Sequence, residues 1–232
     1  MVIVSGQVDT DIDKKNVYRY LGYSADSEPP ARISALIEEY AEEVHHLITP
    51  SYSYVFRQIE RVQGSRVYVE GSGDLLSQPI VFESEVIARL LEQSHRVAVL
   101  LVTIGNLLEE TVCQLAEDGL VLQASVLDAI GSDAVEKVAD YVEGVIREST
   151  YADGFVISRR FSPGYCDWDI TQQRAIFRAV NGSSVGVDLT DRCLMIPRKS
   201  ISGIVGIGLP ESDIENYNPC KTCDKYDCCG RR

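Results

Sequence analysis

The chain has 232 residues, of which 45% are hydrophobic and 25% are charged, a balance that excludes a disordered or fibrous protein and fits one globular domain. Its 35 acidic residues outnumber its 22 basic ones and give a net charge of −13, which disfavours nucleic acid as a partner. The longest apolar run is too short to span a membrane and the first residues lack a secretion signal, so we expect a soluble cytoplasmic protein whose seven cysteines are thiols or metal ligands.

The first part of the chain predicts a helix followed by an antiparallel hairpin. Apolar residues recur at helical spacing after Pro29-Pro30, and Pro50 ends that pattern. From Tyr52 to Val69 the residues become β-branched and aromatic around Gly64-Ser65, which is typical of a two-stranded hairpin. Because this hairpin breaks a regular alternation of strands and helices, we expect an α+β fold with a mainly antiparallel sheet rather than a doubly wound parallel one.

The remaining elements are predicted from the same patterns of apolar residues. Gly131 divides a long helical stretch in two, and Ser132 fits the N-cap of the second part. The expected helices are 83–94, 107–117, 121–130, 132–148 and 170–180; the expected strands are 80–82, 97–104, 155–161 and several between 185 and 209. The unbroken apolar run over 97–104 indicates a strand that is buried on both faces.

Residues 159–168, RRFSPGYCDW, carry side chains suited to binding a ligand. Arg160 offers a planar fork that matches a carboxylate, and Gly164 lets the backbone approach a bound molecule closely. Tyr165 adds a ring that can cover a ligand. From the residues alone, two interpretations stay open: a ligand-binding turn, or a structured loop whose Trp168 packs on the core.

Two separated segments resemble a known family. The string RFSPGY and the later MIPRKSISG are similar to the RPAPGYP and WPGASVSG segments of the activation (reactivation) domain of cobalamin-dependent methionine synthase. The helix segment VEKVADY, Val135 to Tyr141, and VYRYLGY near the N-terminus also take similar places along the chain. The resemblance covers most of the chain, and its specific motifs lie between Ser132 and Gly208.

This resemblance implies a twisted, mainly antiparallel sheet with flanking helices, formed by residues 1–215. Domains of the family bind S-adenosylmethionine in a shallow groove and cap the corrinoid of the methyltransferase during reductive remethylation. The implied partners are a cobalamin-carrying methyltransferase, methionine synthase above all, and an electron donor protein. Carried over by motif, the ligand-binding residues are Glu136, Arg160, Ser162, Gly164 and Tyr165.

Each of these residues receives a role from the resemblance. Arg160 holds the ligand carboxylate, Ser162 and Gly164 offer backbone contacts, Tyr165 lines the ligand and corrin side, and Glu136 faces the ligand from its helix. The resemblance implies no catalytic residue, because methyl transfer takes place on cobalt.

The chain departs from the family pattern at two places near the implied ligand. Ile204 and Val205 follow the SISG segment where the family has an aromatic pair, and Gly22 takes the place of an aspartate that contacts the ligand amino group. These departures predict weaker binding of S-adenosylmethionine or a different ligand.

The C-terminal tail, residues 216–232, predicts a metal site by its cysteines. Cys220, Cys223, Cys228 and Cys229 lie within ten residues, and soft thiolates suit zinc or an iron–sulfur cluster. Since adjacent cysteines seldom bind one small centre together, three of the four form the minimum set, with Cys229 or Cys166 as the fourth thiolate. The alternative is a tail of free thiols.

The expected function is that of a stand-alone reactivation partner of a corrinoid methyltransferase. Two alternatives stay open: a capping module for corrinoid proteins that does not use S-adenosylmethionine, and a cysteine-rich redox protein. For a reactivation partner or a capping module, we expect Tyr165 and Trp168 to anchor the corrinoid protein from an exposed turn.

Overall fold

The computed structural model describes residues 2–5, 8, 10–24, 27, 29–71, 79–180 and 185–221. In this part of the chain the strands build a seven-stranded sheet in the order β4-β3-β2-β5-β9-β6, with β1 also paired to β2. Its strands are β1 (Val2–Ser5), β2 (Ser51–Gln63), β3 (Arg66–Val69), β4 (Ile80–Glu83), β5 (Arg96–Thr103), β6 (Val156–Ile157) and β9 (Ser200–Gly208). All of these pairings are antiparallel, which confirms the predicted α+β class.

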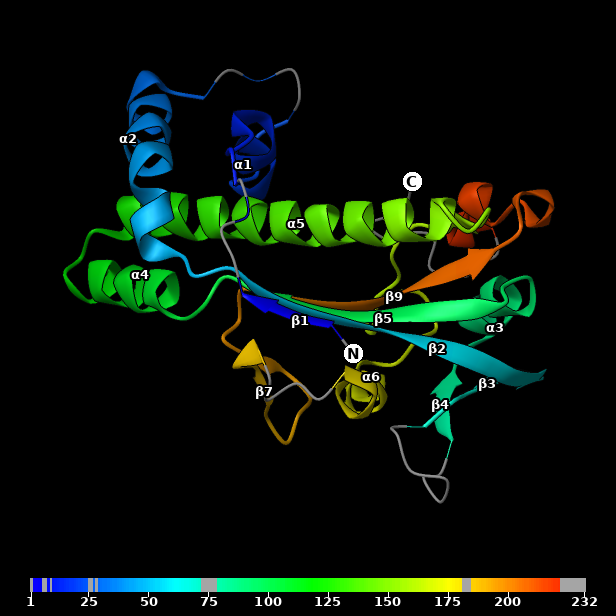
Figure 1. Ribbon diagram of the computed structural model, residues 1–232. Coiled ribbons are helices and arrows are strands. Elements are labelled where there is room, and N and C mark those ends of the chain that lie inside the picture. Colours follow the sequence, from blue (N-terminus) through cyan, green and yellow to red (C-terminus); the bar gives the residue numbers. More distant parts are fainter. Residues whose placement is uncertain are drawn as a thin grey trace.

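Helices cover both faces of the sheet (Figure 1). The helices are α1 (Lys14–Tyr20), α2 (Ala31–Leu47), α3 (Glu85–Glu92), α4 (Leu107–Glu117), α5 (Val121–Tyr151) and α6 (Gln173–Val180). One core lies between the sheet and α1, α2, α4 and α5, and a second lies between the opposite face and α3 and α6. A small hairpin of β7 (Asp188–Leu189) and β8 (Met195–Ile196) lies on the second side.

Strand β5 is apolar along its length because both of its faces are buried. Ala98, Leu100 and Val102 face the first core, and Val97, Val99 and Leu101 face the second. The strand lies between β2 and β9, so its edges are paired as well. The prediction of a strand buried on both faces is confirmed.

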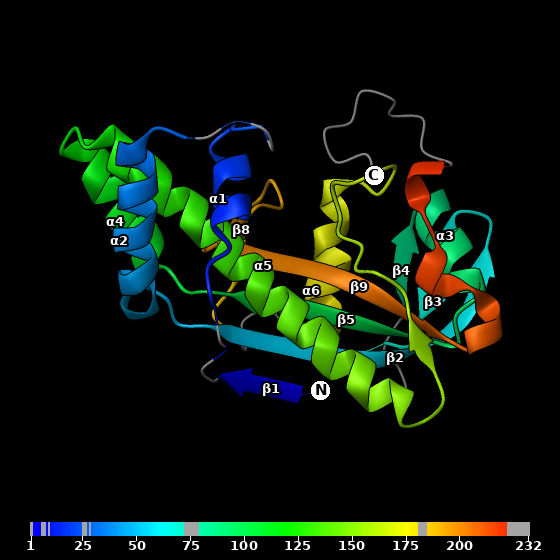
Figure 2. The same ribbon diagram turned by 90° about the horizontal axis from the view of Figure 1, so that it is seen from above.

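The predicted break at Gly131 is wrong, because α5 runs unbroken across the sheet (Figure 2). A methyl group at Gly131 would lie 2.6 Å from a side-chain carbon of Leu108, so the glycine serves the contact between α4 and α5. Ser132 is not an N-cap; its hydroxyl donates to the carbonyl of Asp128 one turn earlier. A glycine inside a helix costs about 1 kcal/mol relative to alanine, and the close packing of α4 against α5 offsets this cost.

Two elements near the N-terminus were not predicted. Strand β1 adds to the edge of β2, and α1 begins after Asp13, whose carboxylate accepts a hydrogen bond from the Lys15 amide. The strand predicted over 155–161 is shorter, consisting of β6 and a single bridge between Phe161 and Ile204. No helix in the described residues is both long and apolar enough to cross a membrane.

Candidate functional site

The centre of the candidate site is an acidic stripe on α5. Glu136, Asp140 and Glu143 follow one another at intervals of four and three residues, so they share one face of the helix. Side-chain exposure falls from 68% at Asp140 and 42% at Glu136 to 17% at Glu143. Only Glu136 was singled out from the sequence, although the spacing of the other two carboxylates was a signal for the whole stripe.

Arg160 meets this stripe from the segment that follows β6. Its Nη2 lies 2.6 Å from Glu136 Oε2 and 3.9 Å from Asp140 Oδ1, and its Nη1 lies 3.3 Å from Glu143 Oε2. The side chain is 13% exposed, so one largely buried guanidinium faces three carboxylates. The sequence-predicted pair Arg160 and Glu136 is thus in direct contact.

The charges within this cluster are unevenly matched. Burial raises the pKa of Glu143, the Arg160 guanidinium opposes that change, and the neighbouring Asp140 adds to it. Arg160 Nη1 is buried and, within the described part of the chain, forms no hydrogen bond of good geometry despite its closeness to Glu143. The site therefore holds surplus negative charge together with an Arg160 donor that is not fully satisfied.

A glycine on β9 allows Arg160 to reach this position. The backbone of Phe161 exchanges two hydrogen bonds with Ile204, of 2.8 and 2.9 Å, which fixes the segment along β9. A methyl group at Gly203 would lie 2.7 Å from the Phe161 carbonyl oxygen and 2.9 Å from Arg160 Cγ. It would also approach Ser162 Oγ to 3.2 Å. Gly203 therefore determines how closely the predicted binding segment lies against the sheet.

The end of α1 lies near the acidic stripe. Burial raises the pKa of Tyr20, and the charge of Glu136 is the next cause, so this tyrosine lies within electrostatic reach of the stripe. Asp133 is fully buried and accepts hydrogen bonds from the Asp13 amide and the Asn16 side chain, at 2.8 and 2.9 Å. These bonds join α1 to α5. Neither Tyr20 nor Asp133 was predicted as a site residue, because only the fold brings them here.

The turn after Arg160 separates its two large aromatic residues. Gly164 has φ +96°, a left-handed conformation that favours glycine, and its amide donates to the Trp168 carbonyl at 2.7 Å. Tyr165 is 64% exposed, whereas Trp168 is 2% exposed and packs edge-to-face against Phe82 with ring centroids 5.6 Å apart. The prediction that Trp168 anchors a partner from the surface is wrong, because its ring completes the second core.

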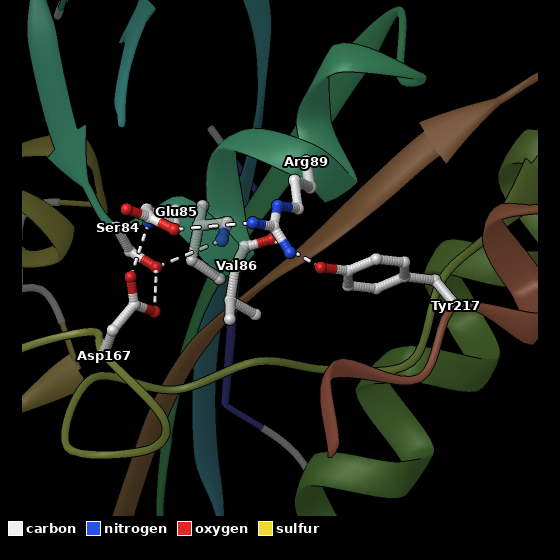
Figure 3. A network of polar contacts seen from close by, with 7 residues as sticks. Ser84, Glu85, Val86, Arg89, Asp167 and Tyr217 are labelled. Atoms are coloured by element: carbon white, nitrogen blue, oxygen red, sulfur yellow. Dashed lines mark hydrogen bonds and ion pairs between the residues drawn. The ribbon is translucent and has the colours of Figure 1, made fainter. Parts of the chain in front are cut away.

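Asp167 fastens this turn to the first turn of α3 (Figure 3). Its carboxylate accepts hydrogen bonds from the Ser84 hydroxyl at 2.7 Å and from the Glu85 amide at 2.5 Å. Ser84 is itself the N-cap of α3 and accepts from the Ile87 amide. A carboxylate at this end satisfies a free amide and complements the helix dipole. Residues 159–168 thus form a structured loop with Trp168 packed on the core, and the same loop leaves Tyr165 exposed. The two interpretations left open by the sequence, a structured loop and a ligand-binding turn, are therefore compatible.

The MIPRKSISG segment is held against the other end of α5. Lys199 Nζ lies 2.9 Å from Asp128 Oδ1 and donates to Ser132 Oγ at 2.8 Å. The guanidinium of Arg198 donates to Glu109 at 2.6 Å. These contacts tie the beginning of β9 to α4 and α5. Arg198 and Lys199 thus hold the strand that carries Gly203, and their charged groups are already paired within the protein.

The departures noted in the sequence occupy different surroundings. Ile204 and Val205 are both fully buried, the first in the core under α6 and the second in the core under α5. Gly22 has φ +88° in the turn that ends α1. The side chains at 204 and 205 therefore serve core packing, and Gly22 lies in the turn two residues after Tyr20.

The predicted metal ligands Cys223, Cys228 and Cys229 lie outside the described residues, and only the backbone of Cys220 is described. Within the described ranges, no group of three or more metal-ligating side chains is placed to hold an ion. The metal site therefore stays a prediction.

No protein-family model matches the chain, and no curated protein matches it by sequence. Among solved structures, the chain is similar to the crystal structure of the MetH reactivation domain bound to AdoHcy. The TM-score is 0.68 and the sequence identity 13%, with 89% of this chain and 78% of the other chain covered. At this identity the likeness establishes the fold, and the predicted architecture of a twisted, mainly antiparallel sheet with flanking helices is confirmed.

Proposed function

We propose that the chain binds an S-adenosyl amino acid at Arg160 and serves as a reactivation partner of a corrinoid-dependent methyltransferase such as methionine synthase. The observation that carries the proposal is the contact between Arg160 and Glu136 beside the exposed turn of Tyr165. It is supported by the shared fold with a reactivation domain whose crystal structure holds AdoHcy.

An arginine–glutamate pair is complementary to the two charged ends of a free amino acid. The ligand carboxylate would take the fork of Arg160, because a guanidinium matches a carboxylate with two parallel hydrogen bonds. Glu136, which is 42% exposed, would turn to the ligand ammonium. Ser162 and Gly164 would supply backbone contacts, and Tyr165 would cover the ligand on the side that meets the partner.

The surplus of carboxylates favours a cationic ligand. Glu136, Asp140 and Glu143 face the Arg160 guanidinium, and Arg147 is the other cation that acts on Glu143, so the carboxylates of the site outnumber its cations. S-adenosylmethionine has a sulfonium charge that S-adenosylhomocysteine lacks, and attraction between opposite charges strengthens the binding of the sulfonium form. We therefore expect the methylated ligand to bind more tightly than its demethylated product.

The test is calorimetric titration of the purified chain with each of the two ligands. Binding of S-adenosylmethionine at micromolar to millimolar concentration, stronger than that of S-adenosylhomocysteine and weakened by salt, is the expected result. Absence of heat for both ligands with a folded protein would contradict the proposal.

One observation favours a second candidate function, a capping module that binds corrinoid proteins without S-adenosylmethionine. The fork of Arg160 is already engaged by Glu136 and Glu143, so a ligand carboxylate must compete with two carboxylates of the protein. Pull-down of a cobalamin-loaded methyltransferase by the chain, unaffected by S-adenosylmethionine, would favour the capping module.

A further inference from the structure

We propose that Tyr20, the last residue of α1, is a specificity-determining residue whose aromatic ring recognises the positive charge of the ligand. The inference rests on the proposed function, because it concerns an S-adenosyl ligand held at Arg160. It goes beyond that function by assigning the distinction between the sulfonium ligand and its uncharged thioether product to one side chain outside the Arg160 cluster.

Helix α1 is fixed on α5 by a buried carboxylate, and Figure 1 shows the two helices in contact. Asp133 of α5 is fully buried and accepts hydrogen bonds from the Asp13 amide at 2.8 Å and from the Asn16 side chain at 2.9 Å. A carboxylate inside a protein needs such donors, so Asp133 determines where α1 lies. Val17 of α1 is fully buried in the core that α5 shares, which strengthens the same contact.

This contact brings the end of α1 to the acidic stripe. Tyr20 follows Asn16 by four residues and Glu136 follows Asp133 by three, so each pair shares one face of its helix. The bond between Asn16 and Asp133 is thus continued one turn later by Tyr20 and Glu136. In agreement, burial is the first cause that raises the pKa of Tyr20, and the charge of Glu136 is a larger cause than that of Asp133. The tyrosine is 41% exposed, so a ligand can reach its ring.

The ring of Tyr20 already lies beside a cation in the protein without ligand. The Cζ atom of Arg19 lies 5.4 Å from the ring centroid, within the roughly 6 Å over which an aromatic face attracts a cation. Arg19 is exposed, so its guanidinium can give way to a competing cation. A ligand cation that approaches Tyr20 would therefore meet a ring that binds positive charge, together with one protein cation that competes for it.

The structure of the ligand puts its charge within reach of this ring. In an S-adenosyl amino acid, two methylene groups separate the sulfur from the α-carbon, a distance of roughly 4 Å. Because Arg160 Nη2 lies 2.6 Å from Glu136 Oε2, a ligand carboxylate held by Arg160 would leave the sulfur close to Glu136 and its neighbour Tyr20. S-adenosylhomocysteine lacks the methyl group and the positive charge at that sulfur, so the face of the ring would stabilise the sulfonium ligand selectively.

The test is calorimetric titration of the full chain and its variants with both ligands, and its readout is the dissociation constant of S-adenosylhomocysteine divided by that of S-adenosylmethionine. Tyr20→Phe keeps the aromatic face, so the ratio should stay within about twofold of the parent. Tyr20→Leu keeps apolar bulk but removes the face, so the ratio should fall roughly fivefold. Arg19→Gln removes the competing cation and should raise the ratio.

Tyr151→Leu is the matched control, because Tyr151 is 76% exposed and lies 15 residues after Glu136, roughly 20 Å along α5. It should leave both dissociation constants unchanged. Thermal unfolding without ligand verifies that each variant is folded.

A ratio that Tyr20→Leu leaves at the parent value overturns the inference. A fall in Tyr20→Phe as large as in Tyr20→Leu also overturns it, because the hydroxyl group and not the ring would then be responsible. If neither ligand binds the folded parent, the proposed function fails and this inference fails with it. If both ligands bind and only the expected change in the ratio is missing, this inference fails alone.

Discussion

The guanidinium of Arg160 lies 2.6 Å from the carboxylate of Glu136, although the two residues are 24 positions apart and belong to different elements. The pair joins the middle of α5 to the segment along β9, and Glu143 holds the other side of the same guanidinium at 3.3 Å. A ligand carboxylate that took both arms of the Arg160 fork would therefore compete with Glu136 and Glu143, and the affinity of the site would depend on how easily Glu136 moves away.

Replacing Arg160 by alanine is expected to abolish most of the binding of S-adenosylmethionine. A hydrogen bond to a charged group contributes about 1.5 to 3 kcal/mol, so its loss should raise the dissociation constant measured by calorimetry roughly 10- to 150-fold. The control is Arg159→Ala, because Arg159 is exposed and directly precedes Arg160. Equal affinities of the two variants would show that the ligand lies elsewhere.

Glu143→Gln is expected to change how stability depends on pH. Burial raises the pKa of Glu143 above its ordinary 4.5, so just above that pH the folded protein keeps a proton that the unfolded chain has lost. The contribution of Glu143 to stability is complete below pH 4.5 and is lost as pH rises through its raised pKa. Glutamine cannot ionise, so the stability of the variant relative to the parent should increase with pH over this window.

Urea unfolding of both proteins at a series of pH values between about 4 and 7 measures this difference. A relative stability that instead decreases with pH would mean that the ion pair with Arg160 outweighs the cost of burying Glu143.

Gly203→Ala should both destabilise the protein and weaken ligand binding. The added methyl group would lie 2.7 Å from the Phe161 carbonyl and displace the segment that carries Arg160, at a cost of about 1 to 3 kcal/mol for overpacking. Gly144→Ala is the control: apart from its chain neighbours and the backbone of its own helix, no atom lies within 4 Å of the added methyl group, so the variant should gain roughly 0.5 to 1 kcal/mol of helix stability. Thermal unfolding measures the stability of the two variants, and calorimetry measures their ligand binding. A loss in Gly203→Ala alone would show that the close approach at Gly203 is responsible, and not the change from glycine to alanine as such.

The two aromatic residues of the turn should respond in opposite ways. Tyr165→Ala removes an exposed ring, so unfolding free energy should change by no more than about 0.5 kcal/mol while binding of ligand or partner decreases. Trp168→Ala removes a ring buried against Phe82 and should cost about 3 to 5 kcal/mol. Trp168 is the sole tryptophan of the chain, so its fluorescence in the Tyr165 variant verifies that the core is intact. Unchanged binding by Tyr165→Ala would place the contact face away from this turn.

The sequence by itself determined the elements whose pattern is local. The helix that ends before Pro50, the hairpin around Gly64 and the doubly buried strand over 97–104 were predicted close to their observed bounds, because periodicity, turn residues and chain breakers act within a few positions. The segment 159–168 was predicted to bind a ligand from its residues and its resemblance, and the structure brings two of the predicted site residues, Arg160 of this segment and Glu136 of α5, into contact.

Tertiary structure decided everything that depends on contacts between distant segments. Gly131 continues a helix instead of ending it because Leu108 packs at that position, and Trp168 is buried because Phe82 lies beneath the turn. The burial of Glu143 and its contact with Arg160 likewise arise only when α5 crosses the sheet. Local pattern specifies an element, but burial and charge pairing are properties of the assembled surfaces, which no window of sequence contains.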